Sequence, residues 1–156
     1  MRNDVSLRAV REVDLPSFFE HQLDADATRM AGFPARGRDE FMAHWAKIMS
    51  AGTAVLRTIV FRGEVAGNVV ALEQAGELNV GYWVGKAHWG KGVASAALSC
   101  FLTEVTTRPV RAHVAKHNGA SIRVLQKCGF VLAGEDRPAG PEGDGGGEWV
   151  MILRGG

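Results

Sequence analysis

The sequence predicts a single domain of the mixed α+β class, in which helices flank a largely antiparallel sheet. The 156 residues are 46% hydrophobic and 22% charged, which is typical of a globular domain that buries a real core. Strand-like alternation opens the chain and dominates its middle, whereas helical patterns lie between these regions and near the end. No repeat or linker divides the chain, so we expect residues 1–156 to form one domain.

The first third of the chain is predicted to contain one strand and three helices. "VSLRAV" alternates as a strand does, and Asp14 followed by Pro16 marks a helix start. "RDEFMAHWAKIMS" carries large apolar side chains on one helical face. The predicted segments are a strand at 5–10 and helices at 15–23, 25–31 and 38–50.

The middle of the chain is predicted to form three consecutive strands. The turn Arg62-Gly63-Glu64 joins two runs rich in β-branched residues, which is a hairpin signal. A short Gln-Ala-Gly turn then leads into a third alternating run. The predicted strands cover 53–61, 65–73 and 77–84.

The last part of the chain is predicted to alternate between helices and strands. A helical run follows two glycines, Pro109 precedes a short apolar run, and Gly129 is placed to end a second helix. The predicted segments are a helix at 92–105, a strand at 110–115, a helix at 119–128, a strand at 130–135, a loop at 136–147 and a strand at 148–154.

Charge and hydropathy exclude several classes of protein. The net charge is +1, from 18 basic and 17 acidic residues, and this balance argues against a nucleic-acid partner. No apolar stretch approaches the roughly 20 residues that span a bilayer, so we expect no membrane partner and a cytoplasmic location. Cys100 and Cys128 lie in apolar helical patterns without metal-ligand spacing, which predicts buried free thiols and no metal site.

The segment "HWGKGVASAALSCFL", residues 88–102, places glycines directly before a helix. Such a turn leaves backbone N–H groups free to bind an anion, and the helix dipole adds partial positive charge there. Gly90 and Gly92 allow close approach of a phosphate, while Lys86 and Lys91 supply countercharge. The pattern matches neither of the common nucleotide-binding loops. It therefore predicts either a phosphate site of another kind or merely a tight turn.

The segments "GYWVGKAHWGKGVASAAL" and "KHNGASIRVLQKCGF" together resemble the GCN5-related N-acetyltransferases, in particular the branch of ribosomal-protein N-terminal acetyltransferases. The family's acyl-CoA pyrophosphate motif, Q/R-x-x-G-x-G/A, falls on residues 89–94, with Trp89 in place of Gln or Arg. The resemblance covers nearly the whole chain. It implies a mostly antiparallel sheet splayed between strands 77–84 and 110–115, with acetyl-CoA as acyl donor in the gap and no metal.

The resemblance also implies which residues hold the cofactor. The pantetheine chain is expected to pair with backbone near Tyr82 to Val84 like an added strand, and the pyrophosphate to lie on the loop. The expected cofactor-binding residues are Tyr82, Trp83, Val84, Trp89, Gly90, Lys91, Gly92, Val93, Ala94, Asn118 and Ser121.

The catalytic residues are less clearly marked. Many family members use a tyrosine of the second helix to protonate the thiolate, but here that position is Leu125. Ser121 is the candidate by resemblance, with Asn118 holding the pantetheine or a water; the alternatives are a plain first-turn residue and an N-cap. Glu73 is the candidate general base, although such a glutamate is more often a solvated hairpin residue. A backbone N–H near residues 79–80 is expected to bind the oxyanion.

In this family the helices between the first two strands line the acceptor pocket. The candidate acceptor-binding residues are His21, Asp24, Arg29, Phe33 and Trp45. For Trp45, core packing on an amphipathic helix is the favoured interpretation. A peptide N-terminus, an amino acid, a polyamine and an aminoglycoside all remain open as amine acceptors.

The expected reaction is direct attack of a primary amine on acetyl-CoA in a ternary complex. The missing tyrosine keeps an alternative open, namely a catalytically weak acyl-CoA-binding sensor or interaction module. The resemblance also allows a homodimer that pairs through strand 148–154.

Overall fold

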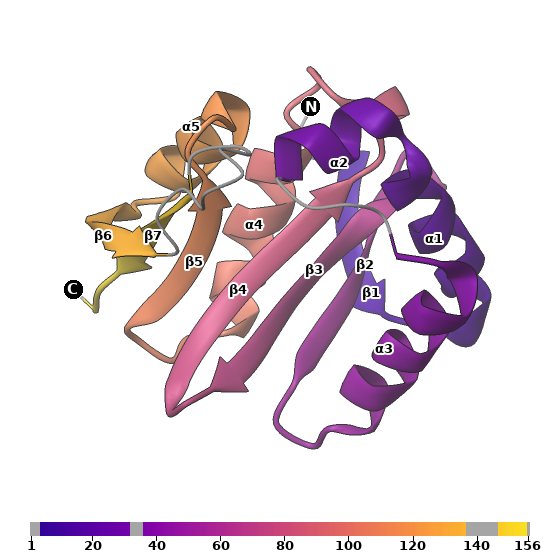
Figure 1. Ribbon diagram of the computed structural model, residues 1–156, viewed down its shortest axis with the longest axis horizontal. Helices are drawn as coiled ribbons and strands as arrows, with labels where there is room; N and C mark the ends of the chain where they lie inside the picture. The colour runs from indigo at the N-terminus through magenta and orange to yellow at the C-terminus, as the bar shows by residue number, and fades with distance from the viewer. Residues whose placement is uncertain (1–3, 32–35, 137–146, 156) are drawn as a thin grey trace.

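A computed structural model describes residues 4–31, 36–136 and 147–155. A seven-stranded sheet in the order β1-β2-β3-β4-β5-β7-β6 forms its centre (Figure 1). Its strands are β1 (Val5–Ala9), β2 (Val55–Phe61), β3 (Glu64–Gln74), β4 (Glu77–Val84), β5 (Val110–Ala115), β6 (Val131–Asp136) and β7 (Glu148–Leu153). The α-helices are α1 (Leu15–Leu23), α2 (Ala25–Ala31), α3 (Arg38–Ser50), α4 (Val93–Glu104) and α5 (Gly119–Lys127).

The predicted helices and strands are all present within the described residues, with ends displaced by at most two positions, whereas the predicted loop at 136–147 lies almost entirely outside those residues. Two short 3-10 helices, η2 (Glu12–Asp14) and η3 (Lys86–His88), are additions that the sequence patterns did not predict. Each is only three residues long, which is too short to carry a helical period. Cys100 and Cys128 are free thiols, as expected, but Cys100 is exposed rather than buried because it lies on the outer side of α4.

The sheet is antiparallel except where β4 meets β5. These two strands are paired in parallel only at Leu78 with Val110 and at Asn79 with Arg111. Beyond Asn79 the strands diverge, so residues 80–84 of β4 have no strand paired on that side (Figure 1). The mostly antiparallel sheet with a splay between β4 and β5 is therefore confirmed.

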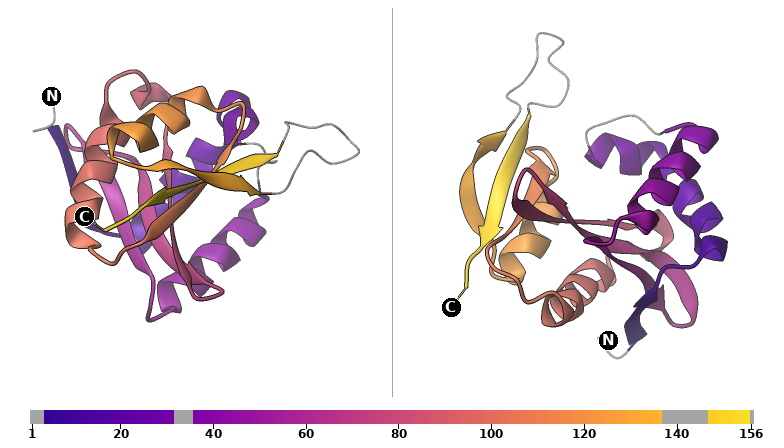
Figure 2. Two further views of the ribbon diagram at one scale, coloured as in Figure 1. Left: turned by 90° about the vertical axis from the view of Figure 1, so that its left-hand side faces the viewer. Right: turned by 90° about the horizontal axis from the view of Figure 1, so that it is seen from below.

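Each face of the sheet carries its own hydrophobic core, because strand side chains alternate between the faces. α4 packs on one face around Leu98 and Phe101, while α1 and α3 cover the other (Figure 2). On the second face the rings of Phe18 and Trp45 pack at a tilt, with centroids 5.0 Å apart. Trp45 is 5% exposed and therefore lies in the core, as predicted by the alternative to an acceptor-binding role.

Asp14 ties the first strands to the start of α1. Its side chain does not cap the helix, although α1 begins at the next residue. Instead Arg8 donates two hydrogen bonds of 2.8 Å to its carboxylate, and Thr58 Oγ1 donates one of 2.7 Å. Burial alone would raise the pKa of Asp14, but the bonds from Arg8, the Arg11 backbone and Thr58 outweigh it and hold the pKa at about 2.

Gly67 allows β3 to lie close to β4 at the entrance to the glycine loop, where it pairs with Val84. A Cβ atom at this position would lie 2.0 Å from the Trp83 carbonyl oxygen, which is backbone and cannot rotate away. We expect Gly67→Ala to lower the free energy of unfolding by about 1–3 kcal/mol, measured by urea denaturation.

Gly81→Ala in β4 is the matched control for this prediction. A Cβ atom there meets only a Val70 methyl group at 4.0 Å, so the unfolding free energy should stay within about 1 kcal/mol of wild type. If Gly67→Ala and Gly81→Ala lost equal stability, the cause would be the strand propensity of the new residue, and not the close approach of β3 to β4 at Gly67.

Candidate functional site

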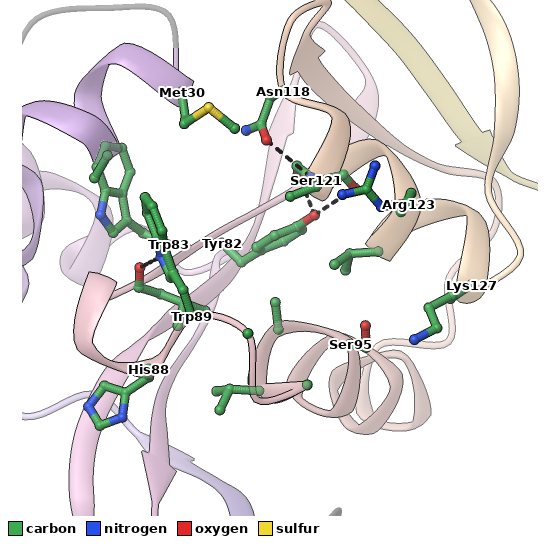
Figure 3. A pocket seen from close by; sticks show the side chains of 18 of the residues that line it. Met30, Tyr82, Trp83, His88, Trp89, Ser95, Asn118, Ser121, Arg123 and Lys127 are labelled. Atoms are coloured by element: carbon green, nitrogen blue, oxygen red, sulfur yellow. Dashed lines mark hydrogen bonds between the residues drawn. The ribbon is translucent and has the colours of Figure 1, made fainter.

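A cavity of about 720 Å³ opens where β4 and β5 diverge. Figure 3 shows that its side chains converge from the end of β4, the glycine loop, α5 and α2. The described cavity wall contains no Asp, Glu or Cys side chain. The hydroxyls of Ser95, Tyr82 and Ser121, the Asn118 amide and the cations Arg123 and Lys127 are among the polar groups that line it. The site is thus an apolar gap with a few polar groups along its length, which suits a long, flexible ligand.

The glycine loop presents bare backbone to one end of this cavity. Gly90 and Gly92 both have φ of 76°, and a Cβ atom at either position would meet nothing within 4 Å. Gly92 is the N-cap of α4, and no side chain caps that end of the helix. The first N–H groups of α4 are therefore available to a ligand, where the helix dipole favours an anion.

Trp89 fixes the loop to the end of β4. Its indole Nε1 donates a 2.9 Å hydrogen bond to the Val84 carbonyl, while 40% of the side chain stays exposed (Figure 3). The two lysines near the loop serve other contacts. Lys86 is bound to Asp26, and the Lys91 ammonium lies over the Phe61 ring, 6.0 Å from its centroid. The anion site is therefore built mainly from backbone.

Tyr82, Ser121 and Asn118 form one hydrogen-bonded group in the cavity wall (Figure 3). The Tyr82 hydroxyl lies 2.6 Å from Ser121 Oγ, and Asn118 Oδ1 accepts a 3.1 Å bond from the Ser121 N–H. Asn118 is thus the N-cap of α5, as the structural alternative expected. Burial raises the pKa of Tyr82 to about 12, despite the hydrogen bond with Ser121 that lowers it. The phenol therefore keeps its proton at neutral pH.

α2 spans the cavity mouth and contributes Ala27 and Met30 to its wall. Lys86 of η3 forms an ion pair with Asp26 on one side, and its Nζ lies 3.9 Å from Asp24. On the other side, His117 Nε2 donates a 2.5 Å hydrogen bond to the Arg29 carbonyl. Contacts on both sides of the gap therefore hold α2 in place.

The structure brings most of the expected cofactor residues together. Tyr82, Trp83, Val84, Trp89, Gly90, Gly92, Val93, Ala94, Asn118 and Ser121 all line the cavity, whereas Lys91 lies beside it. Sequence reasoning missed Arg123 and Lys127, which also line it. Arg123 and Lys127 are four positions apart on one helix, so they share a face of α5, and this spacing is the signal that would have indicated them.

The catalytic and acceptor candidates are more scattered. Glu73 is exposed and pairs with Leu78, so it lies four residues, or about 13 Å, along the ladder from Tyr82. Asp24 and Arg29 lie on the outer side of the mouth, and Trp45 is in the core. Phe33 lies outside the described residues.

His21 lies behind the cavity, against Gly85. A Cβ atom on Gly85 would approach the His21 ring to 2.7 Å, and the His21 Nδ1 atom is buried without a partner among the described residues. Burial lowers the pKa of His21, and nearby His88 lowers it further. The imidazole is therefore neutral at pH 7 and supports the bend that starts the glycine loop.

The described part of the chain shows neither a metal-binding cluster nor a membrane-spanning helix. No group of three or more His, Cys, Asp or Glu side chains there is arranged to hold a metal ion. No described helix is long and apolar enough to cross a membrane.

Comparisons with known proteins agree with this geometry. The family model of the acetyltransferase (GNAT) domain matches residues 4–131. No curated protein sequence matches the chain.

Several solved structures share the fold. The RimL acetyltransferase of ribosomal L7/L12, in complex with coenzyme A, superposes with a TM-score of 0.81 at 21% identity, over 97% of this chain and 94% of that one. Spermidine N-acetyltransferase from Vibrio cholerae, with CoA and spermine, gives a TM-score of 0.81 at 18% identity, over 97% and 96%. An acetyl transferase from Salmonella typhimurium that modifies the N-terminal serine of L7/L12 gives 0.80 at 21% identity, over 98% and 96%.

Proposed function

The chain belongs to the GNAT acetyltransferase family, and from this we propose that it transfers the acetyl group of acetyl-CoA to a primary amine. One observation carries the proposal: the unpaired edge of β4 and the bare backbone of the glycine loop open into the same cavity. Coenzyme A combines a chain with two amides and a pyrophosphate, which are the groups that these two surfaces suit.

The pantetheine arm fits the edge of β4 at residues 80–84. Backbone groups there have no strand partner on the β5 side, so the amides of the arm can add to the sheet as a short strand does. The pyrophosphate then lies at the N-terminus of α4, with Gly90 and Gly92 beneath it. Lys127 and Arg123 of α5 lie on the opposite wall of the cavity and supply positive charge to the bound coenzyme.

The transfer itself needs a neutral amine, a donor for the oxyanion and a donor for the leaving sulfur. An α-amino group has a pKa of about 7.7–8.0, so a sizeable fraction is neutral at pH 7 without a strong base. The described cavity wall offers no carboxylate, which suits such an acceptor better than a lysine side chain with a pKa near 10.4. A backbone N–H of β4 near Val80 is the oxyanion donor in this scheme.

Ser121 is the donor to the leaving sulfur. The amine nitrogen bonds to the acetyl carbon, the carbon–sulfur bond breaks, and the thiolate takes up the proton that the amine loses. Ser121 Oγ stabilises the negative sulfur by a hydrogen bond, and Asn118 holds the Ser121 backbone in place. Glu73 remains a candidate base only through a chain of waters, given its distance from Tyr82.

The acceptor enters beneath α2 in this proposal. Asp24 and Asp26, which would attract a polyamine, are engaged by Lys86, and Asp26 also by Arg29. Met30 and Ala27 make that part of the wall apolar. These contacts favour a peptide N-terminus or an amino acid over a polycationic amine as the acceptor.

The test is a free-thiol assay with acetyl-CoA and a panel of amines that includes N-terminal peptides, amino acids and spermidine. We expect turnover with an α-amine and a loss of roughly ten- to a hundred-fold in kcat in Ser121→Ala. Ser50→Ala, which removes an exposed hydroxyl bonded only to Lys47 within α3, is the matched control and should keep wild-type turnover. Tight coenzyme binding without thiol release from any amine would favour an acyl-CoA-binding module instead.

A further inference from the structure

We propose that Tyr82 is a positioning residue for the reaction, acting through Ser121 to direct and strengthen its hydrogen bond to the leaving sulfur; this inference rests on the function proposed above. Tyr82 is the only tyrosine of the chain, and it reaches across the cavity from β4 to the first turn of α5 (Figure 3). The 2.6 Å separation of its hydroxyl from Ser121 Oγ is a short, strong contact.

The chemistry of the two hydroxyls decides which one donates. A phenol has a pKa near 10, far below that of an alkyl hydroxyl, so it is the better donor and the serine oxygen is the better acceptor. The phenol has a single hydrogen, and its other contact, to the Ser121 carbonyl oxygen, is much longer, at 3.3 Å against 2.6 Å, so we assign the hydrogen to the shorter contact with Ser121 Oγ. Tyr82 therefore donates to Ser121, and the serine hydrogen is left for another acceptor.

The consequence for Ser121 is both orientation and strength. A serine in the first turn of a helix has several rotamers, some of which turn the hydroxyl back toward the preceding carbonyls. The phenol holds the oxygen on the cavity side instead. A hydroxyl that accepts one hydrogen bond also becomes a stronger donor in the next, because hydrogen bonds in a chain polarise one another.

The surroundings of the phenol preserve this arrangement. Tyr82 packs between Val80 and Val84 on the α4 face of the sheet, and Leu125, one turn after Ser121, is 1% exposed beneath it. The apolar setting keeps the phenol protonated over the working pH range. Tyr82 then donates without giving up its proton, so the proton balance of the transfer is unchanged.

The test is a double-mutant cycle with Tyr82→Phe and Ser121→Ala, read as kcat and as KM for acetyl-CoA. Tyr82→Phe removes one oxygen, and we expect it to lower kcat about ten-fold while KM and Tm stay close to wild type. Because Tyr82 acts through Ser121, the double variant should be no slower than Ser121→Ala alone, within about two-fold.

Two results would overturn the inference while leaving the proposed function intact. One is wild-type kcat in Tyr82→Phe. The other is a double variant whose loss equals the product of the two single losses, since the two residues would then act independently. If the first result came with a changed KM, Tyr82 would be assigned to cofactor binding alone. A wild-type protein that turns over no amine would refute the proposed function, and this inference with it.

Discussion

Replacing Asp14 by alanine is expected to lower the free energy of unfolding by about 3–5 kcal/mol. The Asp14 side chain is only 2% exposed, and its removal takes away the carboxylate that accepts hydrogen bonds from both the Arg8 guanidinium and the Thr58 hydroxyl. The substitution also removes the hydrogen bonds that join β1 and β2 to the start of α1. Urea denaturation followed by circular dichroism measures the loss.

Glu104→Ala is the matched control. It breaks the ion pair between Arg57 and Glu104, whose N–O distance of 2.8 Å equals that of the pair between Arg8 and Asp14. Both side chains of the Arg57–Glu104 pair are about one-third exposed, at 30% and 34%. We expect a loss below about 1 kcal/mol there. A loss from Asp14→Ala no larger than that of Glu104→Ala would contradict the role assigned to this buried carboxylate.

The same carboxylate makes stability depend on pH in a defined window. Its pKa falls from 3.8 to about 2 on folding, so its contribution is fully present above pH 4 and is lost as the pH falls through 2. The shift corresponds to about 2.5 kcal/mol, at 1.36 kcal/mol per pKa unit. Unfolding measured between pH 5 and pH 2 should show this loss in wild type and not in Asp14→Asn.

Gly92→Val is expected to weaken coenzyme A binding by roughly ten- to a hundred-fold. A valine strongly resists φ of 76°, and its side chain would enter the open space in front of α4. The first N–H groups of α4 would then turn away from the pyrophosphate. Loss of one charge-assisted hydrogen bond, at about 1.5–3 kcal/mol, accounts for a change of this size. Isothermal titration calorimetry with coenzyme A measures it.

The chain offers a close control in Gly63, which turns the β2–β3 hairpin with φ of 83° and also has open space around it. Gly63→Val carries the same backbone strain away from the cavity. Both variants should lose similar stability, whereas only Gly92→Val should lose affinity. Equal affinity for coenzyme A in the two variants would mean that the glycine loop is only a tight turn.

Sequence patterns predicted the course of the chain well, because long alternating or helical runs determine which side chains can be buried. The glycine loop was found for a related reason: glycines at 90 and 92 stand where positive φ is needed.

Other features depend on contacts between distant segments, which no local pattern encodes. Asp14 was interpreted as a helix-start residue, but its partner Thr58 lies 44 positions away. Tyr82 and Ser121 are 39 positions apart, so their hydrogen bond emerges only when β4 and α5 face each other across the splay. Trp45 and Glu73 have side chains that suit a binding or catalytic site. In the fold, however, Trp45 lies in the core and Glu73 lies at the end of β3 that is far from the cavity.

The most direct test of the account follows the acetyl group itself. The protein is incubated with acetyl-CoA carrying an isotopically labelled acetyl group and with a mixture of α-amino peptides, amino acids and polyamines, and the amines are analysed by mass spectrometry. We expect label on an α-amine in an amount equal to the thiol released. Bound coenzyme with label that never reaches any amine would contradict it.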